Sequence, residues 1–394
     1  MIPVATAKKI IHENIIPLGS INLSLAEALG MVLSQDIFAE FDIPAYPQSS
    51  MDGYAFSYTN WQPENTLKIK GEMQAGADAI IQCLPEQAIR IFTGAAVPEG
   101  ADSVVMQEKV TIDNGELKIE DENIILGSNV RPKGSEIKAG ELALAKGTVL
   151  SPAALGFLAG IGITHAAVYK KPVVSIIVTG KELQQPGQPL SYGQVYESNS
   201  YTLIAALQQL NITDVELFWA DDEPGILTNI LSTALQQADV VLLTGGVSVG
   251  DYDFVLQAAA NCQVKQQFHK IKQRPGKPIY FGTKENKLVF GLPGNPSSVL
   301  TCFYEYVTPA LQELSSKPST IKMLKVPLGK AIKKAAGLTH FLKGWFDGEL
   351  ATPLDAQESY KLSSFARANC LIMIDENLSD CQAGEMVEIH LLTV

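Results

Sequence analysis

The chain has no long hydrophobic run and no excess of positive charge. None of its apolar stretches reaches the ~18 residues that a membrane-spanning helix needs, so we expect no membrane partner. Its 30 Lys and Arg residues face 42 Asp and Glu residues, which gives a net charge of −12. Nucleic acid and anionic membranes require a basic face, so we expect no nucleic-acid partner, and any anion site must be local. Residues 1–14 lack a long apolar core, and we expect no signal peptide.

Cysteine is scarce and histidine is scattered. The five cysteines are odd in number and form no Cys-x-x-Cys pair, which argues against a disulfide framework and a zinc site and fits a reducing, cytoplasmic location. None of the five histidines has a neighbour at metal-binding spacing. The 46% apolar content of the 394 residues is ample for large cores, and the length alone predicts two to three domains.

The first 170 residues mix helical and β patterns. Residues 4–15 and 24–35 have helical periodicity, and short β runs with turns follow up to about residue 135. Asp113-Asn-Gly115 predicts a tight hairpin in this β-rich lobe. Ser151-Pro152 predicts a helix start. The most apolar stretch of the chain, residues 153–167, predicts a buried helix followed by a turn.

Residues 172–315 alternate continuous apolar strands with helices. Strands are expected at 173–179, 215–219, 239–244, 278–281 and 287–290, and helices at 199–210, after 222–224, after Asp253 and at about 297–314. This order predicts a doubly wound, mostly parallel α/β domain with helices on both faces. Ligands of such sheets bind beyond the carboxyl ends of the strands. After Pro318, short β runs with Gly turns predict a small C-terminal β domain.

The most informative segment is Thr244-Gly-Gly-Val-Ser-Val-Gly-Asp-Tyr-Asp-Phe254, which directly follows an apolar strand. Glycines let backbone N–H groups crowd an anion, and carboxylates hold a hard cation such as Mg²⁺. The segment matches neither the Walker pattern nor Gly-x-Gly-x-x-Gly, so nucleotide hydrolysis and dinucleotide redox chemistry are poorly supported. It therefore predicts a phosphate–metal site, with a plain tight turn as the alternative.

Three further segments lie close to this loop in the predicted sheet. In Gly291-Leu-Pro-Gly-Asn-Pro296, Asn295 suits a helix N-cap and Pro296 the first helical position. The run 270–277 holds four cations, which predicts an anion site or, alternatively, a solvated face. Carboxylates at strand ends predict a divalent-metal site, although each alone is more typical of a helix cap or a solvated acid. These carboxylates are Glu182, Asp222 and Asp253.

Taken together, the motifs resemble those of the molybdopterin molybdenumtransferase family (bacterial MoeA and the E domain of gephyrin). They match in order across essentially the full chain. The matching runs are Met51-Asp-Gly-Tyr-Ala55, Thr93-Gly-Ala95, Val97-Pro-Glu-Gly-Ala-Asp102, Thr179-Gly-Lys-Glu-Leu183, Thr244-Gly-Gly-Val-Ser-Val-Gly250 with Asp253, Arg274-Pro-Gly-Lys-Pro278 and Gly291-Leu-Pro-Gly-Asn-Pro296.

The resemblance implies an elongated homodimer of four-domain subunits. The domains would be residues 1–41 plus 136–170 (helical), 42–135 (inserted β-rich lobe), 171–318 (α/β, similar to the molybdopterin adenylyltransferases) and 319–394 (C-terminal β). The site would lie between the α/β domain of one subunit and the partner's lobe. The implied reaction inserts Mo from molybdate into adenylyl-molybdopterin and releases AMP with help from Mg²⁺. A molybdopterin adenylyltransferase and molybdoenzymes are possible partners.

The resemblance also suggests roles for single residues. Gly245, Gly246 and Ser248 would cradle the phosphate, as would the loop formed by Pro293, Gly294, Asn295 and Pro296. Asp222 and Asp253 would hold the metal, and Lys270, Arg274 and Lys277 would offset ligand charge. Asp52, Thr93 and Glu182 would position molybdate or move protons.

The chain departs from the family pattern at a few positions. Glu136, a further candidate catalytic residue, lies in Gly134-Ser-Glu136, where the family often has Gly-Glu-Asp. Arg274 replaces a common Lys, and Lys343 replaces a frequent Arg. Ser364, a candidate substrate-binding residue of the C-terminal domain, is present as in the family. None of these changes removes a type of charge from the expected site.

Two other functions stay open at this point. A gephyrin E-like scaffold could keep the fold without the chemistry, although the acidic and basic site residues are intact and no long linker or second enzymatic domain is present. A molybdopterin adenylyltransferase would share the α/β domain. The 170 residues that precede that domain, with Met51-Asp-Gly-Tyr-Ala-Phe56, argue against this second alternative.

Overall fold

The computed structural model describes residues 1–78, 81–221, 223–246 and 254–392. The chain divides into two compact units. Residues 1–23, 30–34 and 167–394 form the larger unit, and residues 24–29 and 35–166 form the smaller one. Among the described helices, none combines the length and apolar character needed to cross a membrane.

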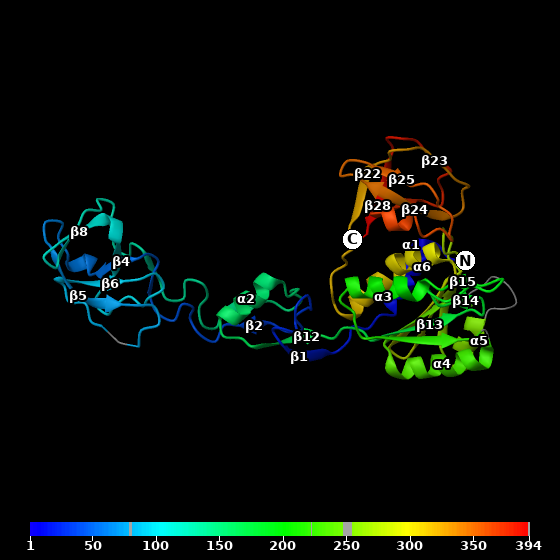
Figure 1. The fold of residues 1–394 in the computed structure, drawn as a ribbon, viewed down its shortest axis with the longest axis horizontal. Coiled ribbons are helices and arrows are strands. Elements are labelled where there is room, and N and C mark those ends of the chain that lie inside the picture. Colours follow the sequence, from blue (N-terminus) through cyan, green and yellow to red (C-terminus); the bar gives the residue numbers. More distant parts are fainter. Residues whose placement is uncertain (79–80, 222, 247–253, 393–394) are drawn as a thin grey trace. The chain divides into compact units, whose positions relative to one another are not determined.

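A six-stranded sheet forms the centre of the larger unit (Figure 1). Its order is β16 (Val215–Ala220), β13 (Val174–Thr179), β17 (Val240–Thr244), β21 (Lys287–Leu292), β20 (Tyr280–Lys284) and β18 (Lys265–His269). The first four strands are parallel, and β20 is antiparallel to both β21 and β18. The predicted mostly parallel α/β sheet is therefore confirmed.

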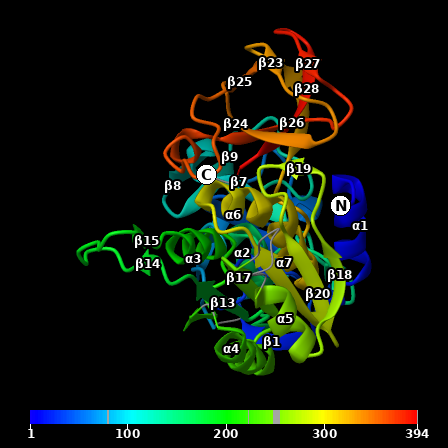
Figure 2. The same cartoon turned by 90° about the vertical axis from the view of Figure 1, so that its right-hand side faces the viewer.

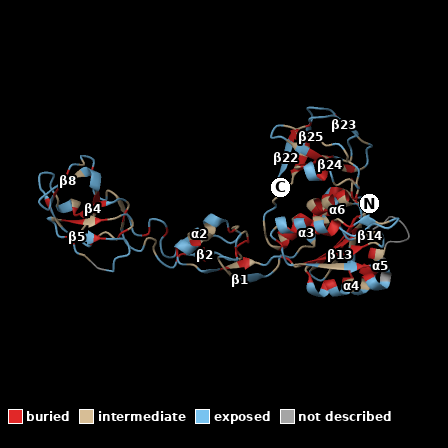
Figure 3. Cartoon of the chain, in the orientation of Figure 1, coloured by how far each residue is buried: buried red, intermediate tan, exposed pale blue. Residues whose placement is uncertain are grey.

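Helices cover both faces of this sheet, as Figures 1 and 2 show. One face packs against α1 (Val4–Glu13), α3 (Asn199–Gln209), α6 (Pro296–Cys302), the π-helix Phe303–Val307 and α7 (Thr308–Leu314). The other face packs against α4 (Pro224–Gln237) and α5 (Phe254–Asn261). Successive strand residues point to opposite faces, so Ile176 enters the first core and Ile177 the second. Figure 3 shows the resulting buried sheet between helices with exposed outer faces.

A second sheet forms the C-terminal part of the same unit. Its order is β19 (Gln273–Arg274), β24 (Thr339–Phe346), β26 (Cys370–Ile374), β28 (Met386–Leu391) and β22 (Met323–Pro327), with β25 (Ala351–Pro353) beside β24. A short pair, β23 (Ile332–Lys333) and β27 (Asp380–Cys381), lies beside its core. Because β19 comes from the run between β18 and β20, the cationic segment 270–277 is joined to the C-terminal sheet.

The smaller unit contains a third six-stranded sheet. Its order is β7 (Ser103–Met106), β4 (Gly53–Phe56), β6 (Gln87–Ile91), β5 (Leu67–Met73), β9 (Glu116–Ile119) and β8 (Val110–Asp113). Asn114 and Gly115 have positive φ between β8 and β9, which confirms the predicted hairpin.

The smaller unit also contains one helix, α2 (Pro152–Gly160), and two short strand pairs. These are β3 (Gln48–Ser49) with β10 (Val130–Arg131), and β2 (Ile37–Phe38) with β11 (Leu142–Leu144). The strands β1 (Ser20–Ser24) and β12 (His165–Tyr169) pair along the chain that joins the units, and β14 (Leu183–Gln184) pairs with β15 (Val195–Tyr196) in the larger unit.

Two expectations about the first 170 residues are wrong. Residues 24–35 form turns and bridges rather than a helix, because Gly30 adopts a positive φ of 72° and Leu33 pairs with Val168. The helix α2 begins as predicted, with the Ser151 hydroxyl accepting a hydrogen bond from the Ala154 N–H at 3.2 Å. However, Leu158 is its one buried residue, so this apolar helix is largely exposed in the chain.

All five cysteines are buried and reduced. Burial raises the pKa of the Cys83 thiol to about 11 and of Cys370 to about 12. Burial likewise raises the pKa of Cys262, Cys302 and Cys381.

Candidate functional site

Loops from neighbouring parallel strands meet at the carboxyl edge of the α/β sheet. In the order β16–β13–β17–β21, the chain first places β16 on one side of β13 and then places β17 on the other. The space beyond β13 and β17 is therefore the topological switch point, where open α/β sheets bind ligands. Thr179-Gly180 and Thr244-Gly245 end these two strands, as the sequence predicted.

Gly245 lets two of these loops approach each other closely. Its φ is +85°, and a Cβ atom there would lie 2.4 Å from the Thr179 carbonyl oxygen. A Cβ at Gly294, from the loop after β21, would lie 3.9 Å from the Gly245 Cα. Backbone from three strand ends is thus packed together at the switch point, and no side chain at Gly245 separates the loops.

A cleft with a volume of about 830 Å³ opens beside these loops. This volume is in the range of pockets that hold ligands the size of a nucleotide or a cofactor. Its walls come from the loop after β13, the start of α3, segment 273–278, the start of α6 and the C-terminal loop 357–360. The lining includes Glu182, Tyr196, Ser198, Asn199, Gln273, Arg274, Lys277, Pro293, Gly294, Asn295, Pro296, Ser298, Glu358, Ser359 and Tyr360.

Two cations of the predicted anion site reach this cleft. Arg274 and Lys277 both line it with exposed side chains. Between them, a Cβ atom at Gly276 would lie 2.5 Å from the Cys302 Sγ atom. The buried Gln273 amide donates to the Pro275 and Gly276 carbonyl oxygens at 3.0 and 3.2 Å. The loop that carries the two cations is therefore anchored to α6 from beneath.

The α6 start is tied to the C-terminal loop. Asn295 is the N-cap residue and Pro296 the first helical residue, as predicted. The Asn295 amide does not cap the helix but donates to the Ser359 hydroxyl at 2.9 Å. The Ser297 N–H donates to the Ser359 carbonyl oxygen at 3.0 Å. One N–H of the helix start is therefore satisfied by Ser359, and this wall of the cleft joins two sheets.

Lys343 holds the C-terminal loop in place. Its buried ammonium donates to the carbonyl oxygens of Ala356, Glu358 and Lys361 at 2.8, 3.3 and 3.1 Å. The buried Ser364 hydroxyl also donates to the Ala356 carbonyl oxygen at 2.8 Å. Lys343 and Ser364 therefore support the loop from behind, and neither is among the residues that line the cleft.

In the smaller unit, Asp52 and Thr93 lie together although they are far apart in sequence. The Asp52 carboxylate accepts from both the N–H and the hydroxyl of Thr93 at 2.8 Å each. These two bonds, opposed weakly by burial and helped by Arg90, lower the pKa of the exposed Asp52 carboxyl. Glu136 is exposed and lines a separate groove with Tyr46 and Arg131.

Several predicted residues have other positions. Lys270 does not line the cleft, and its backbone pairs with Ile2 and Ile279. Ser248, Asp222 and Asp253 lie outside the described residues, and so does the predicted phosphate loop beyond Gly246. Within the part of the chain that the structure describes, no three His, Cys, Asp or Glu residues are placed to hold a metal.

The cleft also contains residues that the sequence analysis missed. Asn199 begins α3, and its amide donates to the Gly294 carbonyl oxygen at 3.0 Å. Among the described residues, none is a hydrogen-bond partner of its own buried Oδ1 atom. The polar run Glu197-Ser-Asn-Ser200 before a helix was a usable signal for it. Ser359 and Tyr360 had no such signal, because only the packing of the C-terminal sheet brings them here.

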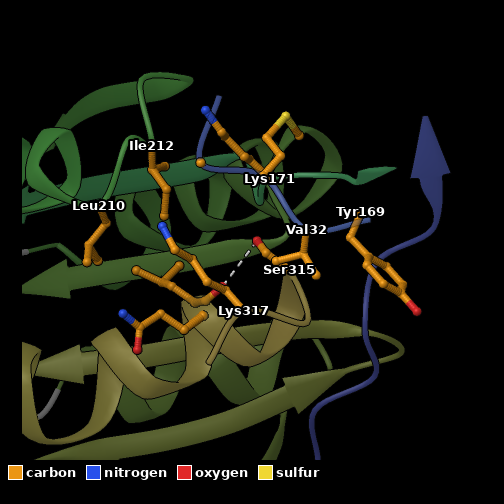
Figure 4. A pocket seen from close by; sticks show the side chains of 11 residues that line it. Val32, Tyr169, Lys171, Leu210, Ile212, Ser315 and Lys317 are labelled. Atoms are coloured by element: carbon orange, nitrogen blue, oxygen red, sulfur yellow. Dashed lines mark hydrogen bonds between the residues drawn. The ribbon is translucent and has the colours of Figure 1, made fainter. Parts of the chain in front are cut away.

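A much smaller cavity lies at the opposite, amino edge of the sheet (Figure 4). Lys171, Ile212 and Lys317 line it. Lys171 lies just before the start of β13, and Ile212 lies just before the start of β16. Burial, and then the charge of Lys317, lowers the pKa of Lys171. The volume of about 20 Å³ holds roughly one water molecule, so this cavity is no substrate site.

Comparisons with known proteins agree over the whole chain. The profile of the MoeA N-terminal region (domain I and II) matches residues 2–162. A "Probable molybdopterin binding domain" matches residues 175–313, and the MoeA C-terminal region (domain IV) matches residues 325–392.

Related proteins and a solved structure also match nearly the whole chain. A molybdopterin molybdenumtransferase of Haemophilus influenzae is 34% identical over 378 residues, which is 93% of each chain. One of Staphylococcus epidermidis is 32% identical and covers 99% of this chain and 95% of its own. The crystal structure of the molybdopterin biosynthesis moeA protein of Pyrococcus horikoshii OT3 matches with a TM-score of 0.82, 29% identity and full coverage of both chains.

Proposed function

Because the chain belongs to the molybdopterin molybdenumtransferase family, we propose that it transfers molybdenum to molybdopterin in the cleft at the carboxyl edge of the α/β sheet. The activity is that of a transferase of molybdenum cofactor biosynthesis. The observation that carries the location is the placement of Arg274, Lys277 and the start of α6 around one cleft of about 830 Å³.

The two cations account for the binding of anionic substrates. Adenylyl-molybdopterin and molybdate are both negatively charged, whereas the chain has a net charge of −12. Arg274 offers a fork of N–H donors that fits phosphate or molybdate oxygens, and Lys277 offers a point charge. Both donors stand on a loop whose backbone is fixed to α6, so the loop itself needs little ordering when the substrate binds.

The apolar and amide groups of the cleft suit the pterin. Asn199 holds a buried carbonyl oxygen with which no described residue pairs, and a buried acceptor of this kind is stabilised when a ligand N–H donates to it. Pterin rings carry such N–H groups. Tyr196 and Tyr360 are exposed at the cleft and offer flat faces for the ring. We assign Asn199 to recognition of the pterin rather than to chemistry.

In the reaction that we propose, the molybdopterin substrate is adenylylated, and AMP is released with the help of Mg²⁺. The described residues provide no three-residue metal site, so this metal would depend on Asp222 and Asp253. When bound, Mg²⁺ would neutralise phosphate charge. An assay for molybdate-dependent AMP release, with EDTA and then with Mg²⁺ restored, tests this requirement. AMP release that persists in EDTA contradicts it.

We further propose that the enzyme is a homodimer and that the partner's Asp52–Thr93 pair completes each site. The exposed, apolar helix α2 supports an interface between two copies. The ionised Asp52, held by Thr93, is suited to position molybdate or to accept a proton.

Mixing two inactive variants tests the shared site. We expect Asp52→Asn and Lys277→Gln each to abolish most AMP release. Random mixing of the two subunits then restores about a quarter of wild-type activity, because half of the dimers gain one intact site. The control Asp121→Asn, which also removes a carboxylate that accepts a backbone N–H, should stay active. A mixture without any recovered activity contradicts the shared site.

The same assay separates the alternatives. A scaffold that lacks the chemistry releases no AMP, and a molybdopterin adenylyltransferase consumes ATP to adenylylate molybdopterin without molybdate. Molybdate-dependent AMP release by the wild type excludes both. The family membership favours neither alternative. Two relatives that match at least 93% of this chain are both named molybdopterin molybdenumtransferase.

A further inference from the structure

A second cavity, of about 330 Å³, lies in the C-terminal part of the larger unit. It is distinct from the proposed molybdopterin cleft but shares a wall with it, formed by Arg274, Pro275 and Gln357. The remaining walls come from the C-terminal sheet and its loops. They include Lys330, Ile332, Lys333, His340, Phe341, Leu342, Pro353, Leu354 and Asp355.

The lining of this cavity carries more positive than negative charge. Arg274, Lys330 and Lys333 line it with exposed side chains. Among the described residues, none of these three forms an ion pair with a carboxylate. One carboxylate, that of the exposed Asp355, lies in the lining. In an acidic chain, three unpaired cations around one hollow indicate an anion.

Backbone pairing fixes two of the polar groups next to each other. The strands β19 and β24 are parallel, with Arg274 opposite His340. Registered neighbours on paired strands place their side chains on the same face of the sheet, and both residues line the cavity. The half-buried Pro353 and Leu354 line the same cavity. Their apolar surface lowers the local dielectric constant and so strengthens the attraction between the cations and an anion.

We propose that this cavity is a binding site for a small, doubly charged tetrahedral oxyanion, separate from the molybdopterin cleft. Arg274 and the two lysines would donate to its oxygens, and the imidazole of His340 would supply one further donor. The volume leaves room for the oxyanion with some of its hydration water. Sulfate, phosphate and molybdate share this chemistry, and so does the phosphate of AMP.

The protonation of His340 provides a direct signal of binding. Burial, together with the charges of Lys334 and Arg274, lowers the pKa of His340 to about 4, so the ring is neutral at pH 7. A bound dianion stabilises the imidazolium form and raises this pKa. The Asp355 carboxylate, which lines the same cavity, repels the anion.

The experiment titrates the His340 ring by NMR in the full-length protein, at constant ionic strength, with sulfate or AMP added. His340→Gln assigns the signal. We expect sulfate to raise the His340 pKa by at least about one unit, which corresponds to tenfold tighter anion binding to the protonated ring. No change up to tens of millimolar oxyanion overturns the proposal. A response to AMP without one to sulfate assigns the cavity to a phosphate monoester and overturns it as a site for free oxyanions.

Charge variants separate a built site from general attraction. The double variant Lys330→Gln/Lys333→Gln should weaken oxyanion binding at least about tenfold. Lys322→Gln/Lys325→Gln removes the same charge from exposed positions of the same domain and should leave binding nearly unchanged. Asp355→Asn should tighten binding several-fold, because it removes a like charge. Equal losses in the two lysine pairs overturn the proposal. Since the readout is binding, the result does not depend on molybdenum transfer.

Discussion

His390 and Glu305 form a buried hydrogen-bonded pair between the C-terminal sheet and the π-helix that precedes α7. The His390 Nδ1 atom lies 2.6 Å from the Glu305 carboxylate, and both side chains are at most 2% exposed. Lys8 of α1 donates to the other Glu305 oxygen at 2.6 Å. Glu388 accepts from the opposite side of the His390 ring at 3.1 Å. Three segments of the larger unit thus meet at one charged cluster.

The cluster shifts the protonation of its members in opposite directions. Burial alone would lower the pKa of His390, but the hydrogen bond and charge of Glu305 outweigh burial and raise it. Burial would raise the pKa of Glu305, but Lys8 and His390 outweigh burial and lower it. Both shifts therefore favour the ionised pair.

These shifts predict a pH dependence of stability. His390, with a raised folded pKa, stabilises fully below its ordinary value of 6.5 and loses this contribution as pH rises through the folded pKa. Glu305 stabilises above its ordinary value of 4.5 and loses its contribution as pH falls through its lowered pKa. The pair contributes most between these two values. Thermal unfolding measured from pH 5 to 8.5 should show the stability of the protein declining above pH 6.5. In the His390→Gln variant this decline should be smaller.

Removing one member of the pair should destabilise the unit strongly. We expect Glu305→Gln to lower the free energy of unfolding by about 3–5 kcal/mol, because it leaves His390 and Lys8 without their buried counter-charge. The control Glu388→Gln changes a carboxylate that contacts the same ring but is 30% exposed, and should cost at most about 1 kcal/mol. Similar losses in both variants would show that the buried pair has no special weight.

Arg274 and Lys277 predict the electrostatics of substrate binding. Arg274→Gln and Lys277→Gln should each reduce kcat/KM for adenylyl-molybdopterin about 10- to 100-fold, as expected for the loss of a charge-assisted contact. Steady-state AMP release measures the effect. Lys265→Gln removes an exposed charge of the same sheet outside the cleft and should behave as wild type. Equal effects of all three substitutions would mean that net charge, not this loop, attracts the substrate.

A side chain at Gly245 should clash with the neighbouring loop, and a substitution at a second glycine without close neighbours serves as the control. Gly245→Ala places a Cβ 2.4 Å from the Thr179 carbonyl oxygen at a φ of +85°. We expect a loss of roughly 2–5 kcal/mol from backbone strain plus overpacking. Gly187 has a φ of +90° with nothing within 4 Å of its Cβ position, so Gly187→Ala should cost only about 1–2 kcal/mol. Chemical denaturation compares the two, and equal losses would remove the role of close loop contact.

Lys343 lies outside the cleft, yet we expect it to hold one wall of the cleft in place. Burial, opposed by Glu358, lowers the pKa of Lys343, but the ammonium still supplies donors to three carbonyl oxygens. Lys343→Met should destabilise the protein by about 1–3 kcal/mol, raise KM and expose residues 354–361 to proteases. Lys361→Met, which removes an exposed ion pair with Glu358, is the control. An unchanged KM in Lys343→Met would contradict the positioning role.

The strands and loops of the α/β sheet could be predicted from the sequence, because local patterns encode them. Continuous apolar runs such as 174–179 indicate buried parallel strands, and Asn295-Pro296 marks the start of α6. The parallel order then implies that Glu182, Gly245 and Gly294 approach one edge. The predicted domain boundaries, metal residues and dimer stay predictions.

Long-range packing explains what could not be predicted. The side chain of Asn295 pairs with Ser359 across 64 residues, and Lys343 and Ser364 face loop carbonyls instead of a ligand. No local pattern indicates such contacts. Residues 24–35 have helical periodicity, yet tertiary pairing of Leu33 and the turn at Gly30 override it.

The burial of all five cysteines makes the natural chain suitable for site-selective chemical labelling. A thiol reacts as its thiolate, so burial and raised pKa values leave Cys83, Cys262, Cys302, Cys370 and Cys381 slow to alkylate. A cysteine introduced by Glu358→Cys at the cleft, where the side chain is 47% exposed, would be the fast-reacting thiol. A fluorophore attached there could follow the arrival of substrate in real time, with every native cysteine left in place.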